Sequence, residues 1–243
     1  MGERRNDRSN GYRALLVGAT GLVGSALLRQ LLADKQCTQV TVLARRPLAD
    51  AVSAELQGKL QVIIADFEQM EEALAGVEAE VVFCALGTTI KKARTQEAFR
   101  RVDYDYPVAL GEWSVQQGIQ KMIVVSAMGA NASSRIFYSR VKGEMEHQLS
   151  AFGLPELHVL RPSLLLGNRA ELRVGEKVAT LLSPLLRVLT VGPFRRYRPI
   201  YDGQVAAAMR AAAVDDGLLS KQGKVRMYES DEIAAAAAVM GMR

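Results

Sequence analysis

Six short apolar runs, separated by segments of helix length, constrain the fold of this chain more than any other feature. The runs are rich in β-branched residues and comprise Ala14–Val17, Val40–Ala44, Val62–Ala65, Val81–Ala85, Met122–Val125 and Leu157–Leu160. None alternates cleanly between apolar and polar positions, which predicts strands that are buried on both faces. The helical segments between them are Leu22–Ala33, Glu68–Ala75, a stretch ending at Gln117, and Arg135–Ala151. Strand, helix and strand at this spacing predict an α/β fold with a doubly wound parallel sheet.

The regular alternation ends near residue 165. Beyond it we expect a helix from Gly175 to about Leu186, a loop that ends at Arg196, an alanine-rich helix capped by Asp202, a strand over Lys224–Met227, and a last helix that begins at Ser230. The sequence therefore predicts three parts: a disordered polar tail (residues 1–11), a core that carries the sheet (residues 12–165), and a small C-terminal lobe (residues 166–243) packed on the same domain.

The composition excludes several classes of protein. Hydrophobic residues make up 49% of the chain and charged residues 23%, so the bulk of it is neither disordered nor of low complexity. The two cysteines, Cys37 and Cys84, lie in apolar strand-like runs and predict free thiols, so we expect a reducing, cytoplasmic location. Neither His147 nor His158 has the spacing of a metal ligand, so we expect no metal site.

Charge and hydropathy narrow the range of partners. The formal net charge of +5 suits an anionic ligand as well as a nucleic acid, but no basic stripe with interleaved aromatic residues occurs, so we expect no nucleic-acid binding. The uncharged stretch Ala14–Leu28 is too short to span a bilayer and contains three glycines, so we expect neither secretion nor stable membrane insertion. The apolar segment Val178–Val191 has three interpretations, in decreasing order of weight: a cover over a substrate pocket, the contact of a homodimer, or a membrane contact.

A glycine-rich turn joins the first predicted strand to the first helix. Its sequence is Gly18-Ala19-Thr20-Gly21-Leu22-Val23-Gly24. Glycines at such a turn let the backbone approach a pyrophosphate closely, and the helix N-terminus attracts its negative charge. The spacing differs from the commonest fingerprint, but its place between the first strand and a helix indicates a dinucleotide site. We assign to cofactor binding Gly18, Thr20, Gly21, Leu22, Val23 and Gly24.

The ends of the next strands carry further candidate cofactor contacts. Arg45 and Arg46 follow the second strand, where a fold that selects NAD usually offers a carboxylate to the ribose. Their planar guanidinium groups suit a 2′-phosphate, which predicts NADP(H); the alternative is a solvated basic turn. Asp66 and Phe67 are candidates for the adenine edge, with a capping Asp as the alternative. The candidates for the ribose and nicotinamide, or for an ordinary turn, are Ala85, Leu86 and Gly87.

A serine, a tyrosine and a lysine supply candidate catalytic groups. Ser126 ends the fifth strand, and Tyr138 and Lys142 follow at a spacing of four residues, which places both on one face of a helix. Taken alone, a Tyr-x-x-x-Lys pair is as well explained by two surface residues. Its combination with a serine at the carboxyl end of a parallel strand is far more specific, because ligands of such sheets bind at that edge.

These residues together resemble the extended or atypical short-chain dehydrogenases/reductases. The resemblance is carried by the glycine turn, Asp66-Phe67, Ser126, Tyr138 with Lys142, and Arg161-Pro162-Ser163. Cys84–Thr89, Arg101–Tyr106 and Val141–Glu144 further resemble the Tat-interactive-protein-like oxidoreductases, and the likeness covers roughly residues 12–235. It implies a Rossmann fold, NADP(H) as cofactor, a catalytic set of Ser126, Tyr138 and Lys142, and cofactor contacts from Tyr138, Lys142, Arg161, Pro162 and Ser163.

The resemblance also implies a function, with one departure from the family pattern. Many members of the wider superfamily carry an asparagine after the fourth strand that supports a proton relay, whereas this neighbourhood offers Asp103 and Asp105; whether either joins a relay stays open. The implied function is an NADPH-dependent reductase of a small carbonyl substrate, with Tyr138 as general acid and the C-terminal lobe covering the substrate. The alternative is a redox-sensing regulator that binds NADP(H) without turnover.

Overall fold

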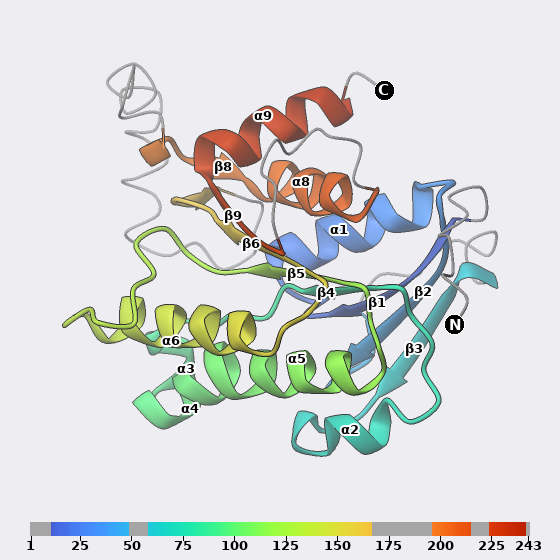
Figure 1. The fold of residues 1–243 in the computed structure, drawn as a ribbon, viewed down its shortest axis with the longest axis horizontal. Coiled ribbons are helices and arrows are strands. Elements are labelled where there is room, and N and C mark those ends of the chain that lie inside the picture. Colours follow the sequence, from blue (N-terminus) through green and yellow to red (C-terminus); the bar gives the residue numbers. More distant parts are fainter. Residues whose placement is uncertain (1–10, 49–57, 167–195, 215–223, 242–243) are drawn as a thin grey trace.

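The computed structural model describes residues 11–48, 58–166, 196–214 and 224–241, and a seven-stranded sheet forms its centre (Figure 1). The strands lie in the order β3-β2-β1-β4-β5-β6-β9, and each neighbouring pair is parallel. They are β1 (Tyr12–Val17), β2 (Cys37–Ala44), β3 (Leu60–Ile64), β4 (Val81–Cys84), β5 (Lys121–Val125), β6 (Glu156–Arg161) and β9 (Val225–Glu229). The predicted doubly wound parallel sheet is therefore confirmed, and its strand order reverses between β1 and β4, which is where such folds bind ligands.

Helices cover both faces of the sheet (Figure 1). One face carries α1 (Leu22–Ala33), α8 (Asp202–Val214) and α9 (Ser230–Gly241), and the other carries α2 (Met70–Ala73), α5 (Tyr106–Gln116) and α6 (Phe137–Ala151). Alternate strand residues serve the two layers, since Leu16 and Phe83 pack with the first group, and Leu15 and Val82 with the second. All four are completely buried, which explains the lack of polar alternation in the strand sequences.

The third strand is an exception to this rule. The run Val62–Ala65 predicts a strand buried on both faces, but β3 is an edge of the sheet, and Val62 and Ile64 are 38% and 54% exposed. That prediction is wrong for β3. Edge and central strands use the same apolar and β-branched residues, so the local sequence does not reveal which strand lacks a neighbour.

Short helices, rather than one long one, connect β4 to β5. They are α3 (Ile90–Ala93), α4 (Gln96–Arg100), the π-helical turn η3 (Arg101–Asp105) and α5. Thr89 and Thr95 start α3 and α4, because each side chain accepts a hydrogen bond from a backbone N–H three residues later. A π turn inside a helix is rare and frequently lies at a functional site.

The described part of the C-terminal third packs on the sheet. β9 pairs with β6, and α8 contacts both α1 and α9. A separate parallel pair joins β7 (Leu165–Leu166) to β8 (Ile200–Tyr201). The expected helix from Gly175 to Leu186, the segment Val178–Val191 and residues 1–10 of the expected tail lie outside the described residues. Within the described ranges, no helix has the length and apolar character needed to cross a membrane.

Candidate active site

The structure brings the predicted site residues to one edge of the sheet. The glycine turn follows β1, Arg45 and Arg46 follow β2, and Ala85–Gly87 follows β4. Three further groups follow β3, β5 and β6, namely Asp66 with Phe67, Ser126, and Arg161–Ser163. Because the strands are parallel, their carboxyl ends all face the same way, and residues far apart in sequence lie along one edge of the sheet, where such folds bind ligands.

The turn between β1 and α1 needs its glycines for two distinct reasons. Gly18 has a φ of +98°, and a Cβ there would lie 2.6 Å from the backbone of Ala85 at the end of β4. A Cβ on Gly24 would lie 2.0 Å from the carbonyl oxygen of Gly18. Gly21 is the N-cap of α1 and offers no side chain, so the first backbone N–H groups of α1 are suited to an anion. In the same turn, the side chain of Thr20 is exposed, that of Leu22 is half-buried and that of Val23 is buried.

The residues after β2 and β3 lie next to one another. Arg45 and Arg46 are both exposed, and the guanidinium carbon of Arg45 lies 5.5 Å from the centre of the buried Phe67 ring. Asp66 caps the 3-10 turn η2 (Phe67–Gln69), because its Oδ1 accepts a hydrogen bond of 3.2 Å from the N–H of Glu68. The capping interpretation of Asp66 is therefore confirmed, and a contact with adenine stays a prediction.

Ser126 presents a buried hydroxyl at the carboxyl end of β5. Its backbone N–H donates to the carbonyl of Leu160 at 2.7 Å, which fixes the residue beside β6. The residue is 5% exposed, and its Oγ has no hydrogen-bond partner among the described residues. Leaving a buried hydroxyl unpaired costs about 1–3 kcal/mol, so Oγ is suited to a polar atom of a ligand.

Tyr138 and Lys142 lie one turn apart at the start of α6. Tyr138 is half-buried, and its ring centre lies 5.6 Å from that of Phe99 in α4. Lys142 is 3% exposed, and its Nζ lies 2.8 Å from Oδ1 of Asp103 in η3. The alternative of a surface pair is therefore wrong, because the lysine is an interior residue held in a buried ion pair.

The surroundings of Lys142 keep its amino group charged. Burial lowers the pKa of Lys142, but the Asp103 carboxylate and Tyr138 together outweigh that effect, so the pKa lies above its ordinary value. Cys84, at the end of β4, is completely buried, and burial raises the pKa of its thiol to about 11. The site thus contains a buried cation, a buried carboxylate and a neutral thiol.

The residues after β6 contact other parts of the chain. The Nε of Arg161 donates to Oε1 of the buried Glu146 in α6 at 3.0 Å. The N–H of Ser163 donates to Oγ of Ser230, the first residue of α9, at 2.8 Å. Pro162 is buried, and its carbonyl accepts a hydrogen bond from the loop after β5. These contacts join β6 to the helices on both faces, and the assignment of these residues to the cofactor stays a prediction.

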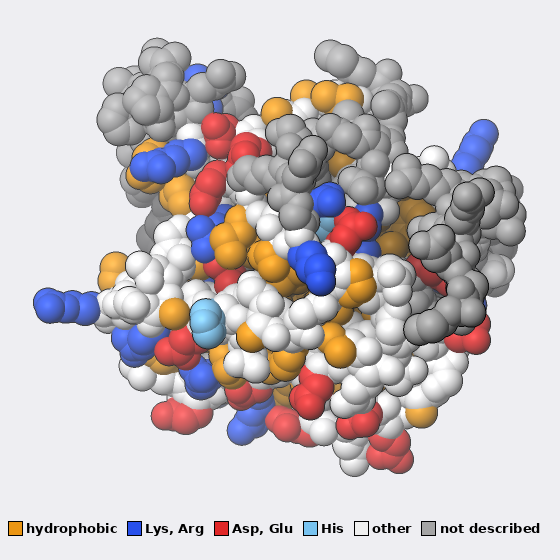
Figure 2. Space-filling view, viewed as in Figure 1, with side chains coloured by type: hydrophobic (Ala, Val, Ile, Leu, Met, Phe, Trp, Pro, Cys, Tyr) orange, Lys and Arg blue, Asp and Glu red, His pale blue; other side chains and the backbone are white. Residues whose placement is uncertain are grey.

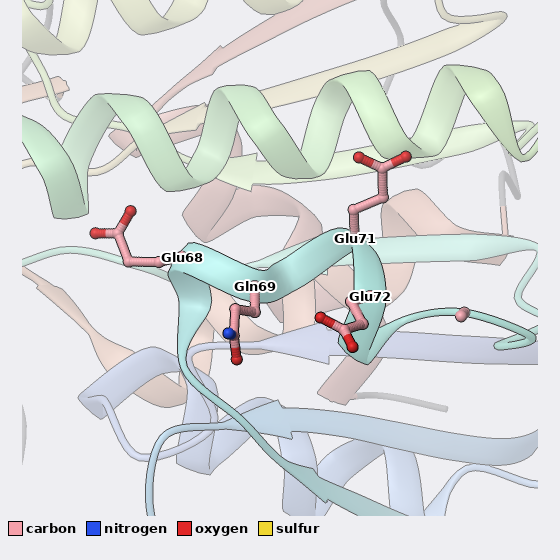
Figure 3. Close-up of a pocket in the computed structure, with 5 residues that line it drawn as sticks. Glu68, Gln69, Glu71 and Glu72 are labelled. Carbon is pink, nitrogen blue, oxygen red and sulfur yellow. The ribbon is translucent and has the colours of Figure 1, made fainter.

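An open cavity lies beside α2. It is lined by Glu68, Gln69, Glu71, Glu72 and Ala75 (Figure 3). The three carboxylates point in different directions rather than toward one point (Figure 3), and no group of His, Cys, Asp or Glu in the described ranges is arranged to hold a metal ion. Acidic side chains gather over this part of the molecule (Figure 2), and their charge would repel a pyrophosphate.

The sequence does not reveal two buried acids as partners of the predicted site residues. Asp103 differs from the asparagine of the family pattern, but its contact with Lys142 depends on the π-helical turn. Glu146 had a usable signal. It lies beside Met145 and four residues after Lys142, among the buried residues of α6, and a buried acid needs a cation such as Arg161.

Comparisons with known proteins agree with this geometry. Residues 18–169 match the family described as NAD(P)H-binding, a range that includes the predicted site residues from Gly18 to Ser163. The chain is 32% identical to "Protein FMP52, mitochondrial" of Eremothecium gossypii over 224 residues, which is 90% of this chain and 95% of that protein. It is 33% identical to "Protein HTATIP2" of Rattus norvegicus over 177 residues, which is 72% of each chain.

Solved structures share the fold at low sequence identity. The 3-oxoacyl-[acyl-carrier protein] reductase from Brucella melitensis in complex with NAD gives a TM-score of 0.69 at 16% identity, over 93% of this chain and 98% of that one. The Bordetella bronchiseptica enzyme WbmG in complex with NAD gives 0.64 at 16% identity, over 97% of this chain and 79% of that one. This likeness shows the shared fold, and the sequence matches show that the chain belongs to the NAD(P)H-binding atypical short-chain dehydrogenase/reductase family.

Proposed function

We propose that the protein is an NADPH-dependent reductase of a small carbonyl compound. The observation that supports this most is the Ser126 hydroxyl, which is buried without a partner in the described structure, at the edge toward which α6 carries Tyr138 and Lys142. A hydrogen-bond donor fixed at such a point suits an oxygen atom on which negative charge develops. The oxygen of a carbonyl compound gains negative charge when hydride adds to its carbon, which is why we propose this substrate class.

We infer that NADP(H) binds along the carboxyl edge of the sheet. Any side chain at Gly18 or Gly24 would clash with backbone, so the glycine turn stays open to a pyrophosphate at the start of α1. The exposed guanidinium groups of Arg45 and Arg46 suit the 2′-phosphate, and Phe67 beside them suits the adenine. The other residues that would hold the cofactor are Asp66, Ala85, Leu86, Gly87, Lys142, Arg161, Pro162 and Ser163.

The proposed chemistry needs one hydride and one proton. The bound cofactor supplies the hydride to the carbonyl carbon. Tyr138 donates its phenolic proton to the carbonyl oxygen, which yields the alcohol, and the phenolate then regains a proton from solvent. Ser126 donates a hydrogen bond to the same oxygen, and Lys142 favours the phenolate through its positive charge and would help to hold the ribose of the cofactor.

A substrate screen tests the proposal. The purified protein is mixed with NADPH and panels of aldehydes, ketones and quinones, and the loss of NADPH absorbance is followed. We expect at least one panel to be reduced, and Ser126→Ala to slow that reaction at least tenfold. Tyr201→Phe, at an exposed tyrosine of β8, is the control and should match wild type. Binding of NADPH without reduction of any carbonyl would contradict the proposal.

A second candidate function is a redox-sensing regulator that binds NADP(H) without turnover. The observation in its favour is that Asp103 joins Lys142 to the loop after β4, since such a contact can couple cofactor binding to the position of that loop. A sensor needs this coupling but no turnover. It predicts that NADPH and NADP⁺ bind with different affinities in calorimetry, or protect the chain differently from a protease, while no carbonyl is reduced.

We infer a cytoplasmic location, because Cys37 and Cys84 are both buried free thiols. The FMP52 relative is named as mitochondrial, so fractionation of cells that express the tagged full chain distinguishes the two compartments. A homodimer formed through residues 178–191 would be contradicted by gel filtration at the monomer volume, with and without NADPH.

A further inference from the structure

Asp103 joins three elements of the candidate site. It is 1% exposed, and its Oδ1 lies 2.8 Å from Nζ of Lys142 in α6. Its Oδ2 accepts a hydrogen bond of 2.8 Å from the N–H of Thr88, in the loop that follows β4. A Cβ on Gly87 would lie 3.6 Å from the same carboxylate. One side chain therefore holds both the lysine and the loop assigned to the ribose and nicotinamide.

The π-helical turn separates two acids that are close in sequence. Asp103 and Asp105 both lie in η3, between α4 and α5. Asp103 is buried against Lys142, whereas Asp105 is exposed. Both residues are acidic and lie on the same turn. Asp105→Asn is therefore a matched control, because it removes an acidic side chain that is not part of the buried pair.

Three groups face the Lys142 ammonium from the elements packed around it. Asp103 faces it from η3, Tyr138 from its own helix, and Cys84 from β4. Burial raises the pKa of the Cys84 thiol, so that group adds no charge at neutral pH. The one negative charge in direct contact with the ammonium is therefore that of Asp103, within the described residues.

The next charges outward form a cluster of two arginines and one glutamate. Arg100 of α4 is bonded to Glu144 of α6, and Nε of Arg140 lies 3.9 Å from the same carboxylate. All three side chains are partly exposed, so solvent and salt screen their effect on the buried groups. What Tyr138 experiences from the interior is thus an ion pair, not an isolated lysine cation.

We propose that Asp103 is a positioning residue that holds Lys142 and partly cancels its charge at Tyr138, which keeps Tyr138 as a proton-donating phenol and favours carbonyl reduction over alcohol oxidation. The inference rests on the proposed function. Reduction requires a phenol that gives up a proton, and oxidation requires a phenolate that accepts one. A neutral residue in place of Asp103 would leave the lysine charge uncompensated and would favour the phenolate.

The ionisation of Tyr138 can be measured without turnover. Tyrosinate absorbance is recorded against pH for the full chain and for its Tyr138→Phe variant, and the difference reports Tyr138 alone. The same difference is recorded in the Asp103→Asn background. We expect the midpoint for Tyr138 to fall by about one pH unit or more when Asp103 is neutralised, because a negative charge close to the phenolate is removed. Asp105→Asn should leave the midpoint unchanged.

Asp103→Asn leaves a buried cation unpaired and could prevent folding, so a second variant is needed. Asp103→Asn combined with Lys142→Met removes both charges and keeps the volumes similar. Because only part of the lysine charge remains uncompensated at Tyr138, the midpoint in the double variant should stay within about half a pH unit of wild type. A rise of one unit or more would show that the lysine charge acts in full, which overturns the proposal.

Turnover data separate this inference from the proposed function. If a carbonyl is reduced, the pH profile of the rate should move to lower pH in Asp103→Asn in parallel with the absorbance midpoint, and oxidation of the alcohol at neutral pH should gain relative to reduction. An unchanged midpoint with active wild type rejects the role of Asp103 alone. A lowered midpoint with no carbonyl reduced supports the charge argument and rejects the reductase.

Discussion

Arg45 and Arg46 are the residues on which cofactor choice should depend. Each charge-assisted contact with a 2′-phosphate contributes about 1.5–3 kcal/mol, and one such contact already exceeds a tenfold difference in affinity. We predict that NADP(H) binds at least tenfold more tightly than NAD(H), and that changing both arginines to alanine removes most of this difference. Calorimetry with both cofactors measures it. Arg29→Ala, at an exposed arginine of α1, should keep the preference, and equal affinities in wild type would refute the assignment.

Tyr138 is the residue that carries the proposed chemistry. A phenol has an ordinary pKa of about 10, and the positive charge of Lys142 favours its ionised form during proton transfer. We predict that Tyr138→Phe keeps the fold and the affinity for NADPH but loses at least a hundredfold in single-turnover hydride transfer. Circular dichroism and calorimetry provide the controls. A wild-type rate in this variant would reject Tyr138 as the acid.

The identity of the edge residues could be predicted from the sequence, but their partners could not. Ser126 and the glycine turn follow apolar runs, so their place at strand ends is set by local pattern. The Asp103–Lys142 contact joins residues almost forty positions apart and depends on how a π turn rotates a short helix, which no local spacing encodes. The engagement of Arg161 with Glu146 likewise depends on which face of α6 is buried.

At the scale of elements, lysine side chains donate hydrogen bonds to the last carbonyls of two helices. Nζ of Lys121 donates to the carbonyls of Ala212 and Ala213 at the end of α8, at 2.9 and 3.1 Å, and Nζ of Lys59 donates to three carbonyls at the end of α1. Unpaired buried carbonyls cost about 1–3 kcal/mol. Lys121 is 7% exposed, so water cannot readily replace its ammonium at these carbonyls. We therefore predict that Lys121→Met lowers the free energy of unfolding by about 1–3 kcal/mol.

Lys59 is the comparison for this effect. It is only half-buried, so water can replace its ammonium at the end of α1, and Lys59→Met should cost less than Lys121→Met. Urea unfolding of both variants measures the difference. An equal loss in the two would show that burial of the carbonyls is not what makes the lysine stabilising.

The packing of α1 on the glycine turn gives a second prediction at this scale. The Cβ of an alanine at position 24 would lie 2.0 Å from the carbonyl of Gly18, so α1 must move away from β1. We predict that Gly24→Ala lowers the free energy of unfolding by about 1–3 kcal/mol and weakens NADPH binding. Gly203 in α8 has nothing within 4 Å of its Cβ position, so Gly203→Ala should be neutral or stabilising in the same urea assay.

Element types were predictable where periodicity is strong, and boundaries were not. The helix predicted from Arg135 begins at Phe137, and the single stretch before Gln117 is broken by two threonine caps. Neither threonine is marked by an apolar period, since α3 and α4 are too short to show one. The exposed edge position of β3 is a property of the assembled sheet and is absent from its sequence.

At the scale of the whole molecule, His158 should set the response to acid. It is 1% exposed, and burial, followed by the nearby Lys121 charge, lowers its pKa from 6.5 to about 4. Between pH 6.5 and about 4, His158 binds a proton in the unfolded chain but not in the folded chain. The free energy of unfolding should therefore fall as pH drops through this window, by about 3 kcal/mol. Urea unfolding at several pH values measures the slope. His158→Gln should flatten it, whereas changing the exposed His147 should not.

The position of β9 also governs the order in which this sheet can be completed. A ribosome that has reached Arg161 has already made six of the seven strands, including β6. The strand that covers the far side of β6 comes from residues 225–229, more than sixty residues further along the chain. Until then, the backbone groups of β6 face an open edge, which is a template for pairing with another chain. The growing chain thus passes through an aggregation-prone stage that lasts until residues 225–229 have been made and can pair with β6.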